Sequence, residues 1–128
     1  MQAELLAEIE RELLSWPGVG KESGSGGPGR GGFWVSPFTS YTLGRKELGH
    51  IHQESGVADL TFTREIHDRL VSEGRATAHA AGLQGVVSYE VRSEEDVAKA
   101  LDLFRLNYDR LRESAERRTA SKGATAQP

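Results

Sequence analysis

The apolar side chains between residues 97 and 111 recur at steps of four, three, four and three residues. They are Val97, Leu101, Phe104, Tyr108 and Leu111. An α-helix has 3.6 residues per turn, so this spacing forms one stripe and predicts a long amphipathic helix. Burying such a side chain stabilises a fold by about 1.5–3 kcal/mol. A stripe shorter than three heptads favours packing within one chain over a dimer seam, so we expect this helix to lie across a sheet.

Two further helices are predicted nearer the N-terminus. Leu5, Ile9 and Leu13 repeat every four residues in 3–15, and the Trp16-Pro17 pair ends this helix because proline has no N–H group. Thr63 is placed to cap a second helix and Gly74 to end it.

Between and after these helices lie short β-type segments, which are residues 33–35, 38–43, 46–53, 57–62 and 85–92. Tight turns at Gly44-Arg45 and Ser55-Gly56 indicate antiparallel hairpins. Strands and helices therefore mix without strict βαβ alternation. This order predicts an α+β fold: a single antiparallel β-sheet meander of about five strands, with the N-terminal, middle and long C-terminal helices packed on one face.

The chain length of 128 residues suits one domain, which we place at residues 1–111. Residues 18–32 contain eight glycines among fifteen residues and are expected to form a flexible loop inside it. They do not fit a phosphate-binding P-loop, because the glycine and the hydroxyl residue that it requires are missing. Residues 112–128 lose apolar periodicity, so we expect a disordered C-terminal tail.

Composition excludes several classes of function. The chain has no cysteine, which rules out disulfides, thiolate metal sites and cysteine nucleophiles. The net charge of −3 makes nucleic acid an unexpected partner. The sequence has neither a signal peptide pattern nor an apolar run of membrane-spanning length, so we expect a soluble, cytoplasmic protein that is a monomer or a weak dimer.

Candidate functional residues gather on the hairpin at residues 46–62. Strand side chains alternate between faces, so His50 and His52 share one face while Ile51 lies on the other. The apolar pattern of the next strand puts Asp59 on the histidine face and Leu60 on the core face. A Ser55-Gly56 turn pairs His52 with Asp59, whereas a Glu54-Ser55 turn pairs His50 with Asp59, and both registers remain open.

Three interpretations of this face stay open. One is a non-enzymatic module that binds a protein or a small-molecule ligand through His50, His52 and Asp59, with candidate contributions from His79, Trp34 and Tyr41. Another is a metal-dependent enzyme with His50, His52 and Asp59 as a two-histidine, one-carboxylate site. The last is a structural or regulatory domain with a solvated polar face. No catalytic residue is assigned, because the G-x-S-x-G motif of serine hydrolases is absent, and the sequence indicates no particular cofactor.

Several segments together resemble a known family, the small bacterial "luciferase domain" proteins. They are WPGV at 16–19, GRKELGHIH, the G-x-A-D-L-T-F segment from Gly56 to Phe62, REIHDRLVSEGRATAH, and SEEDVAKALDLFRLNY. The resemblance covers roughly residues 5 to 111 and places His50, His52, Asp59 and His79 on recurrent polar positions. The family name does not imply light emission. The glycine-rich segment is longer than the family pattern, and the order of elements is also similar to frataxin-like and double-wing α+β domains.

Overall fold

The computed structural model describes residues 2–28, 34–79 and 84–125, with side chains on the last helix described up to Thr119. The helices are α1 (Gln2–Ser15), α2 (Arg64–Ser72) and α3 (Glu94–Thr125). The strands are β1 (Val19–Gly24), β2 (Gly27–Pro28), β3 (Trp34–Val35), β4 (Phe38–Leu43), β5 (Lys46–His52), β6 (Val57–Thr61), β7 (Thr77–Ala78) and β8 (Val86–Glu90).

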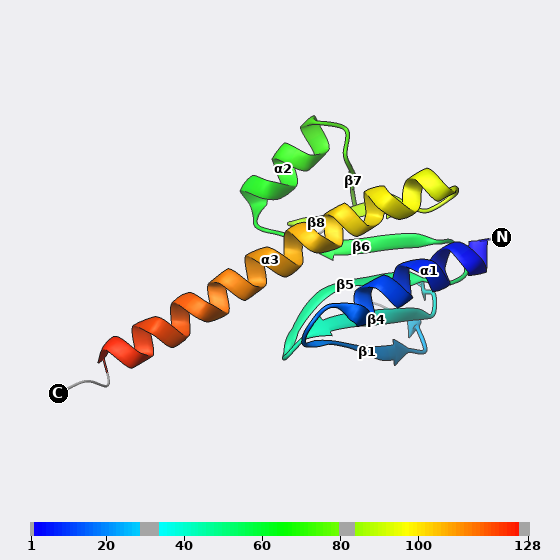
Figure 1. Ribbon diagram of the computed structural model, residues 1–128. Helices are drawn as coiled ribbons and strands as arrows, with labels where there is room; N and C mark the ends of the chain where they lie inside the picture. The colour runs from blue at the N-terminus through cyan, green and yellow to red at the C-terminus, as the bar shows by residue number, and fades with distance from the viewer. Residues whose placement is uncertain (1, 29–33, 80–83, 126–128) are drawn as a thin grey trace.

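The main sheet has six antiparallel strands in the order β1-β4-β5-β6-β8-β7, and β2 and β3 form a separate two-stranded ribbon. Helices α1 and α3 lie side by side across one face of this sheet, and α2 sits beside its β7–β8 end (Figure 1). The α+β prediction is therefore confirmed, with slightly more strands than expected. The helices leave the opposite face of the sheet to the polar side chains.

The core lies between the two long helices and the sheet. Leu5, Ile9 and Leu13 of α1 are all buried there, as the four-residue repeat predicts. On α3 the fully buried stripe runs through Val97, Ala100, Leu103, Phe104, Asn107 and Tyr108, while Leu101 and Leu111 are only partly buried. The predicted stripe therefore lies on the buried side of α3, but the most buried line also includes Ala100 and Asn107, which an apolar pattern does not select.

Part of the segment expected to form a flexible loop is a strand, because Val19–Gly24 forms β1 and pairs with β4, while residues 29–32 lie outside the described residues. A ladder needs backbone hydrogen bonds rather than apolar side chains, so a low-complexity segment can still supply an edge strand. In the segment expected to be a disordered tail, α3 continues to Thr125, and residues 126–128 lie outside the described residues. Arg112 and Glu116, one helical turn apart, form an ion pair at 3.9 Å. Arginine, glutamate and alanine have high helix propensity, so this segment can be helical without an apolar stripe.

Strand β5 contains a bulge that changes which side chains share a face. Tyr41 pairs with Gly49 but Thr42 pairs with Glu47, so Leu48 is an extra residue in the ladder. Both Leu48 and Gly49 are buried, and the alternation restarts after them. The bulge therefore moves Glu47 onto the face of His50, where strict alternation would not place it.

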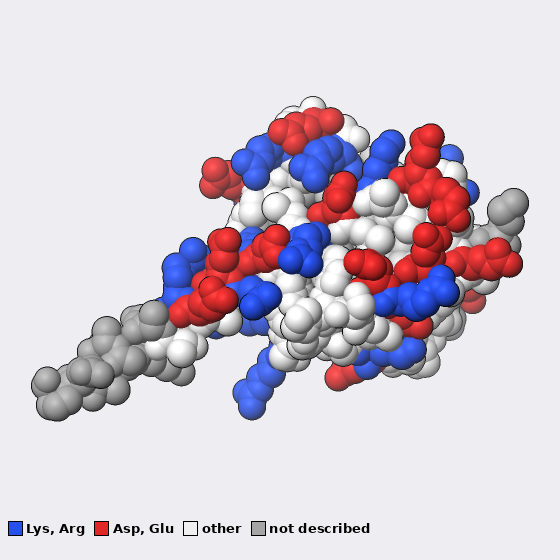
Figure 2. All heavy atoms as spheres, in the orientation of Figure 1, with Lys and Arg blue, Asp and Glu red and all other residues white. Residues whose placement is uncertain are grey.

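Charged side chains of both signs intermix over the helix-covered face, so this face presents no large field of one sign (Figure 2). Across the described ranges, no helix combines the length and apolar content needed to cross a bilayer.

Candidate metal centre

A straight row of polar residues crosses the uncovered face of the sheet. Cross-strand pairing aligns Ser40 on β4, His50 on β5, Asp59 on β6, Ser88 on β8 and Thr77 on β7. The observed register of His50 with Asp59 is the one that a Glu54-Ser55 turn predicts. Neighbours in such a row have Cβ atoms about 4.5–5.5 Å apart, so their side chains interact directly.

Asp59 is the centre of the cluster and is only 3% exposed. Its Oδ2 atom lies 3.3 Å from Nε2 of His50, 3.2 Å from Nε2 of His52 and 3.6 Å from Nε2 of His79. Three imidazoles from β5 and from the end of β7 thus direct the same ring nitrogen at one carboxylate oxygen. The structure brings together all four residues on which the sequence placed the polar site.

The other nitrogens of the two β5 histidines have acceptors of their own. Nδ1 of His50 lies 3.3 Å from the Glu47 carboxylate. Nδ1 of His52 lies 2.8 Å from the Ser36 hydroxyl and 3.2 Å from the Ser36 carbonyl oxygen. A carboxylate only accepts hydrogen bonds, so Nδ1 of His50 donates to Glu47, whereas the role of His52 Nδ1 toward Ser36 depends on the tautomer. In a neutral imidazole that donates from Nδ1, Nε2 carries the lone pair that a metal ion needs.

An aromatic wall closes one side of the cluster. The Phe38 ring centroid lies 4.9 Å from that of His50 and 5.7 Å from that of His52. Phe38 pairs with Gly24 across the β1–β4 ladder, and a Cβ atom on Gly24 would lie within 2.7 Å of ring atoms Cε1 and Cε2. The ring therefore occupies the space that a side chain at position 24 would fill.

The two carboxyl groups of the cluster are held in their ionised form. Burial raises the pKa of Asp59, but hydrogen bonds from His50 and Ser88 outweigh it and lower the pKa below the usual value. Burial also opposes ionisation of Glu47, whose pKa is likewise lowered by hydrogen bonds from His50 and Ser40. Burial lowers the pKa of His50, and the hydrogen bonds and charges of Asp59 and Glu47 reverse this and raise the pKa to about 9.

The spacing of these donor atoms fits a metal ion. Ligands at 2.0–2.2 Å from a tetrahedral ion are separated by about 3.3–3.6 Å, which is close to the distances of Asp59 Oδ2 from the two β5 imidazoles. The ligand atoms of His50, His52 and Asp59 all lie within 4.8 Å of one another, and among the described residues His79 does not join this group. Imidazole and carboxylate ligands suit zinc, iron, nickel and other divalent transition metals.

The remaining predicted residues lie away from the cluster. Tyr41 is buried on the helix side of the sheet, where its hydroxyl donates to Glu10 at 3.0 Å and its ring packs against Phe104. Trp34 is 73% exposed on β3. The fourth histidine of the chain, His67, lies on α2, where its Nδ1 is 2.9 Å from the Asp68 carboxylate.

Sequence reasoning missed four residues that support the cluster, which are Ser36, Phe38, Glu47 and Ser88. The alternation of β8 contains a signal for one of them, because Ser88 lies between the core residues Val87 and Tyr89 and so points to the polar face. Glu47 gave no such signal, since only the bulge brings it there.

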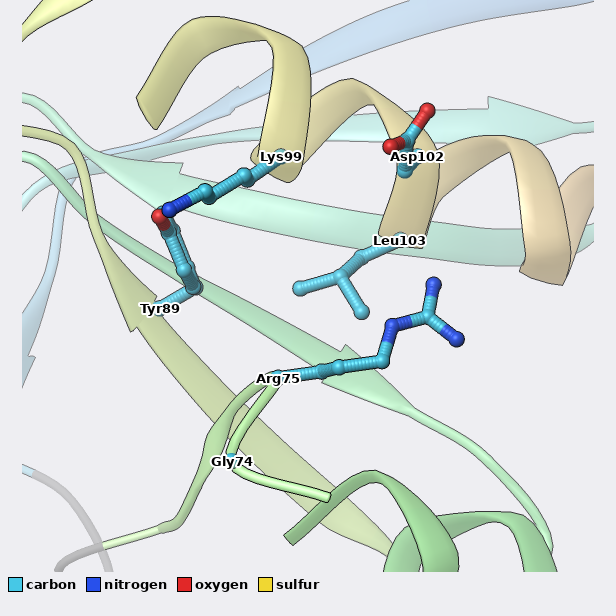
Figure 3. Close-up of a pocket in the computed structure, with 6 residues that line it drawn as sticks. All are labelled: Gly74, Arg75, Tyr89, Lys99, Asp102 and Leu103. Carbon is cyan, nitrogen blue, oxygen red and sulfur yellow. The ribbon is translucent and has the colours of Figure 1, made fainter. Parts of the chain in front are cut away.

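A surface pocket of about 400 Å³ lies on the other side of the sheet. Gly74, Arg75, Tyr89, Lys99, Asp102 and Leu103 line it (Figure 3). None of the cluster residues lines this pocket, so the pocket and the histidine cluster are separate features.

Comparison with known proteins gives one match. Residues 45–107 match the family model described as "Luciferase domain", a segment that contains His50, His52, Asp59, His79 and Ser88. No curated protein and no solved structure matches the chain.

Proposed function

We propose that this chain binds one divalent transition-metal ion at the histidine cluster, whose residues His50, His52, Asp59 and His79 lie within the segment that matches the luciferase-domain model. The ligands are Nε2 of His50, Nε2 of His52 and Oδ2 of Asp59, and His79 lies beside Asp59 as a neighbour of the site. The observation that carries the proposal is the convergence of three Nε2 atoms on a single buried carboxylate oxygen, at separations of 3.2–3.6 Å.

The surroundings support an ion with two positive charges. Asp59 and Glu47 are both ionised, and two carboxylates beside the site offset the charge of the ion. Glu47 and Ser36 orient the two β5 imidazoles from behind, as the outer partners of metal-bound histidines do. His50 and Asp59 already share a hydrogen bond, so an ion bound at this site takes the place of the His50 proton.

The ion also gives the domain a way to bind a further ligand. The side chains of His50 and His79 are 26% and 23% exposed, so the cluster opens to solvent on their side. A small ligand with a donor oxygen or nitrogen can reach an ion there, and a zinc-type ion can expand from four to five ligands. The ligand-binding module that the sequence suggested and the metal site then use the same residues. Tyr41 takes no part, because it lies among the helix-side core residues.

The proposal is tested by metal content. Protein without an affinity tag is purified without chelator, analysed by plasma mass spectrometry, stripped with a chelator, and titrated with zinc or cobalt. We expect about one equivalent of metal per chain, and a complex that unfolds roughly 5–15 °C higher than the stripped protein once the ion exceeds its Kd about a hundredfold.

Variants decide which residues hold the ion. The His50→Ala/His52→Ala protein is expected to lose the metal, and His79→Ala to bind it more weakly. His67→Ala is the matched control, since it removes a histidine outside the cluster. Folded wild-type protein that takes up no transition metal and shows no thermal shift overturns the proposal, as does equal metal content in the double variant and the control.

A further inference from the structure

We infer that Ser88 is a positioning residue that makes Asp59 a one-oxygen ligand, so that the chain supplies three ligands to the metal centre. This inference rests on the proposed metal site and adds how the carboxylate binds. Ser88 does not touch the ion, and its effect passes through the Asp59 carboxylate.

The hydrogen bond between the two residues is short and held by the ladder. The Ser88 hydroxyl donates to Oδ1 of Asp59 at 2.5 Å. The two residues are direct partners in the β6–β8 register, and on its other side Ser88 pairs with Thr77, whose hydroxyl donates to the Ser88 carbonyl at 3.2 Å. Ser88 therefore has strands on both sides, which restrict movement of its backbone.

This hydrogen bond gives the two oxygens of the Asp59 carboxylate different partners. Oδ1 is committed to Ser88, whereas Oδ2 is the atom that the three imidazoles surround. A carboxylate can bind a metal through one oxygen or through both. With Oδ1 turned toward β8, only Oδ2 remains directed at the ion.

The consequence is a defined donor set. Two imidazole nitrogens and one oxygen give three protein ligands, and one solvent molecule completes the four that zinc and cobalt accept in tetrahedral sites. If Oδ1 also turned to the ion, the set would have five ligands and the geometry would change. Ser88 thereby favours zinc-type ions over manganese or magnesium, which prefer six oxygen-rich ligands.

Cobalt(II) reports this geometry directly, because its d–d absorption is intense in four-coordinate sites and weak in sites with more ligands. The stripped wild-type protein, Ser88→Ala and Ser88→Thr are each loaded with cobalt(II) and their visible spectra recorded. Zinc affinity is then measured by competition with a chromogenic chelator. Ser72→Ala is the control, because its hydroxyl donates to the Arg69 carbonyl within α2, away from the cluster.

We expect intense four-coordinate bands for the wild type, Ser88→Thr and Ser72→Ala. Ser88→Ala is expected to show weak bands and a loss of zinc affinity of about 10- to 100-fold, the usual effect of removing an outer partner. Restoration by threonine excludes a merely structural effect, because threonine keeps the hydroxyl donor.

Three results overturn the inference. One is a Ser88→Ala spectrum and zinc affinity equal to those of the wild type. Another is a wild-type cobalt complex with weak bands of higher coordination, which contradicts the coordination number while leaving the metal site standing. The third is a wild-type protein that binds no cobalt or zinc, which removes the proposed function itself and is distinguished from the other two by the titration alone.

Discussion

Gly24 and Phe38 connect the glycine-rich segment to the histidine cluster. A Cβ atom on Gly24 would meet the Phe38 ring, and that ring packs against His50 and His52. An aromatic ring that lies over a cross-strand glycine is a known way to compensate for the missing side chain. Position 24 is therefore restricted by packing rather than by backbone conformation.

Gly24→Ala should lower the free energy of unfolding by about 1–3 kcal/mol, because the added methyl group must displace the ring. Urea denaturation of the stripped protein measures this. Gly20→Ala on the same strand is the control: its Cβ would lie 3.5 Å from Thr42 Oγ1, an ordinary contact, so we expect little change. Equal stability of the two variants would contradict the packing argument.

At the scale of residues, the sequence is informative where strand alternation is regular. His50, His52 and Asp59 follow from the period of two and from the apolar residues between them. Glu47 does not, because the bulge at Leu48 reverses its face. The contact of Ser36 with His52 could not be predicted either, because it depends on the path of the segment between β3 and β4.

Between elements, Asn107 is the contact that joins α3 to the bulged strand. Its Nδ2 donates to the Leu48 carbonyl at 2.8 Å and to the Thr61 carbonyl at 3.2 Å, while Oδ1 accepts from Arg110. The bulge leaves the Leu48 carbonyl without a regular ladder partner, and the amide supplies one. A search for apolar periodicity passes over Asn107, which explains why the predicted helix stripe omits a fully buried residue.

Asn107→Ala should destabilise the protein by about 2–4 kcal/mol, because it removes the side-chain donor to the buried Leu48 carbonyl and opens a small cavity. Thermal or urea unfolding measures the change. The exposed Lys99→Ala on the same helix serves as the comparison and should shift stability by no more than about 0.5 kcal/mol. A loss below about 1 kcal/mol for Asn107→Ala would mean that water satisfies these carbonyls.

The contact between α1 and β4 predicts a dependence on alkaline pH. Burial, and then the charge and hydrogen bond of Glu10, raise the pKa of Tyr41 well above its usual value near 10. The folded protein thus keeps this proton when the unfolded chain has lost it. The stabilisation is complete below pH 10 and falls as the pH rises beyond it.

Tyr41→Phe should therefore cost about 1–2 kcal/mol at pH 8, and the gap to the wild type should narrow above pH 10. Urea denaturation of both proteins from pH 8 to 11 measures it. Tyr89, whose pKa is raised to about 12 by burial and by Asp96, is present in both proteins and cancels in the difference. A constant gap across this range would contradict the shift at Tyr41.

Over the whole molecule, the hydrophobic core and the histidine cluster lie on opposite faces of the main sheet. Helices α1 and α3 cover one face of the sheet and bury the core, whereas the histidine cluster lies on the other face, on strands that the core holds in register (Figure 1). The fold class followed from periodicity and turns. Strand β1 and the extension of α3 did not, because backbone pairing and helix propensity act in segments that have no apolar pattern.

The end of α3 allows a test of how far the stable unit extends. The helix has 32 residues, and its last part runs out beyond the sheet (Figure 1). Tyr108 is fully buried, and its hydroxyl donates to the Pro17 carbonyl at 2.7 Å. Further along α3, Leu111 packs against the core, and the Arg112 guanidinium lies 5.5 Å from the centroid of the Tyr108 ring. Beyond them, residues 113 and 115–119 are exposed.

A chain that ends after Arg112 should keep its free energy of unfolding within about 0.5 kcal/mol, because residues 113 and 115–119 are exposed. It should also bind zinc with unchanged affinity, since every ligand lies between positions 50 and 79. A chain that ends after Asn107 is the control and should lose more than about 3 kcal/mol with the Tyr108 ring, or fail to fold. Urea denaturation measures the stability of both shortened chains, and competition with a chromogenic chelator measures their zinc affinity. If removal of residues 113–128 alone lowers stability by about 2 kcal/mol or more, the helix end contacts the body, and the stable unit extends past the core.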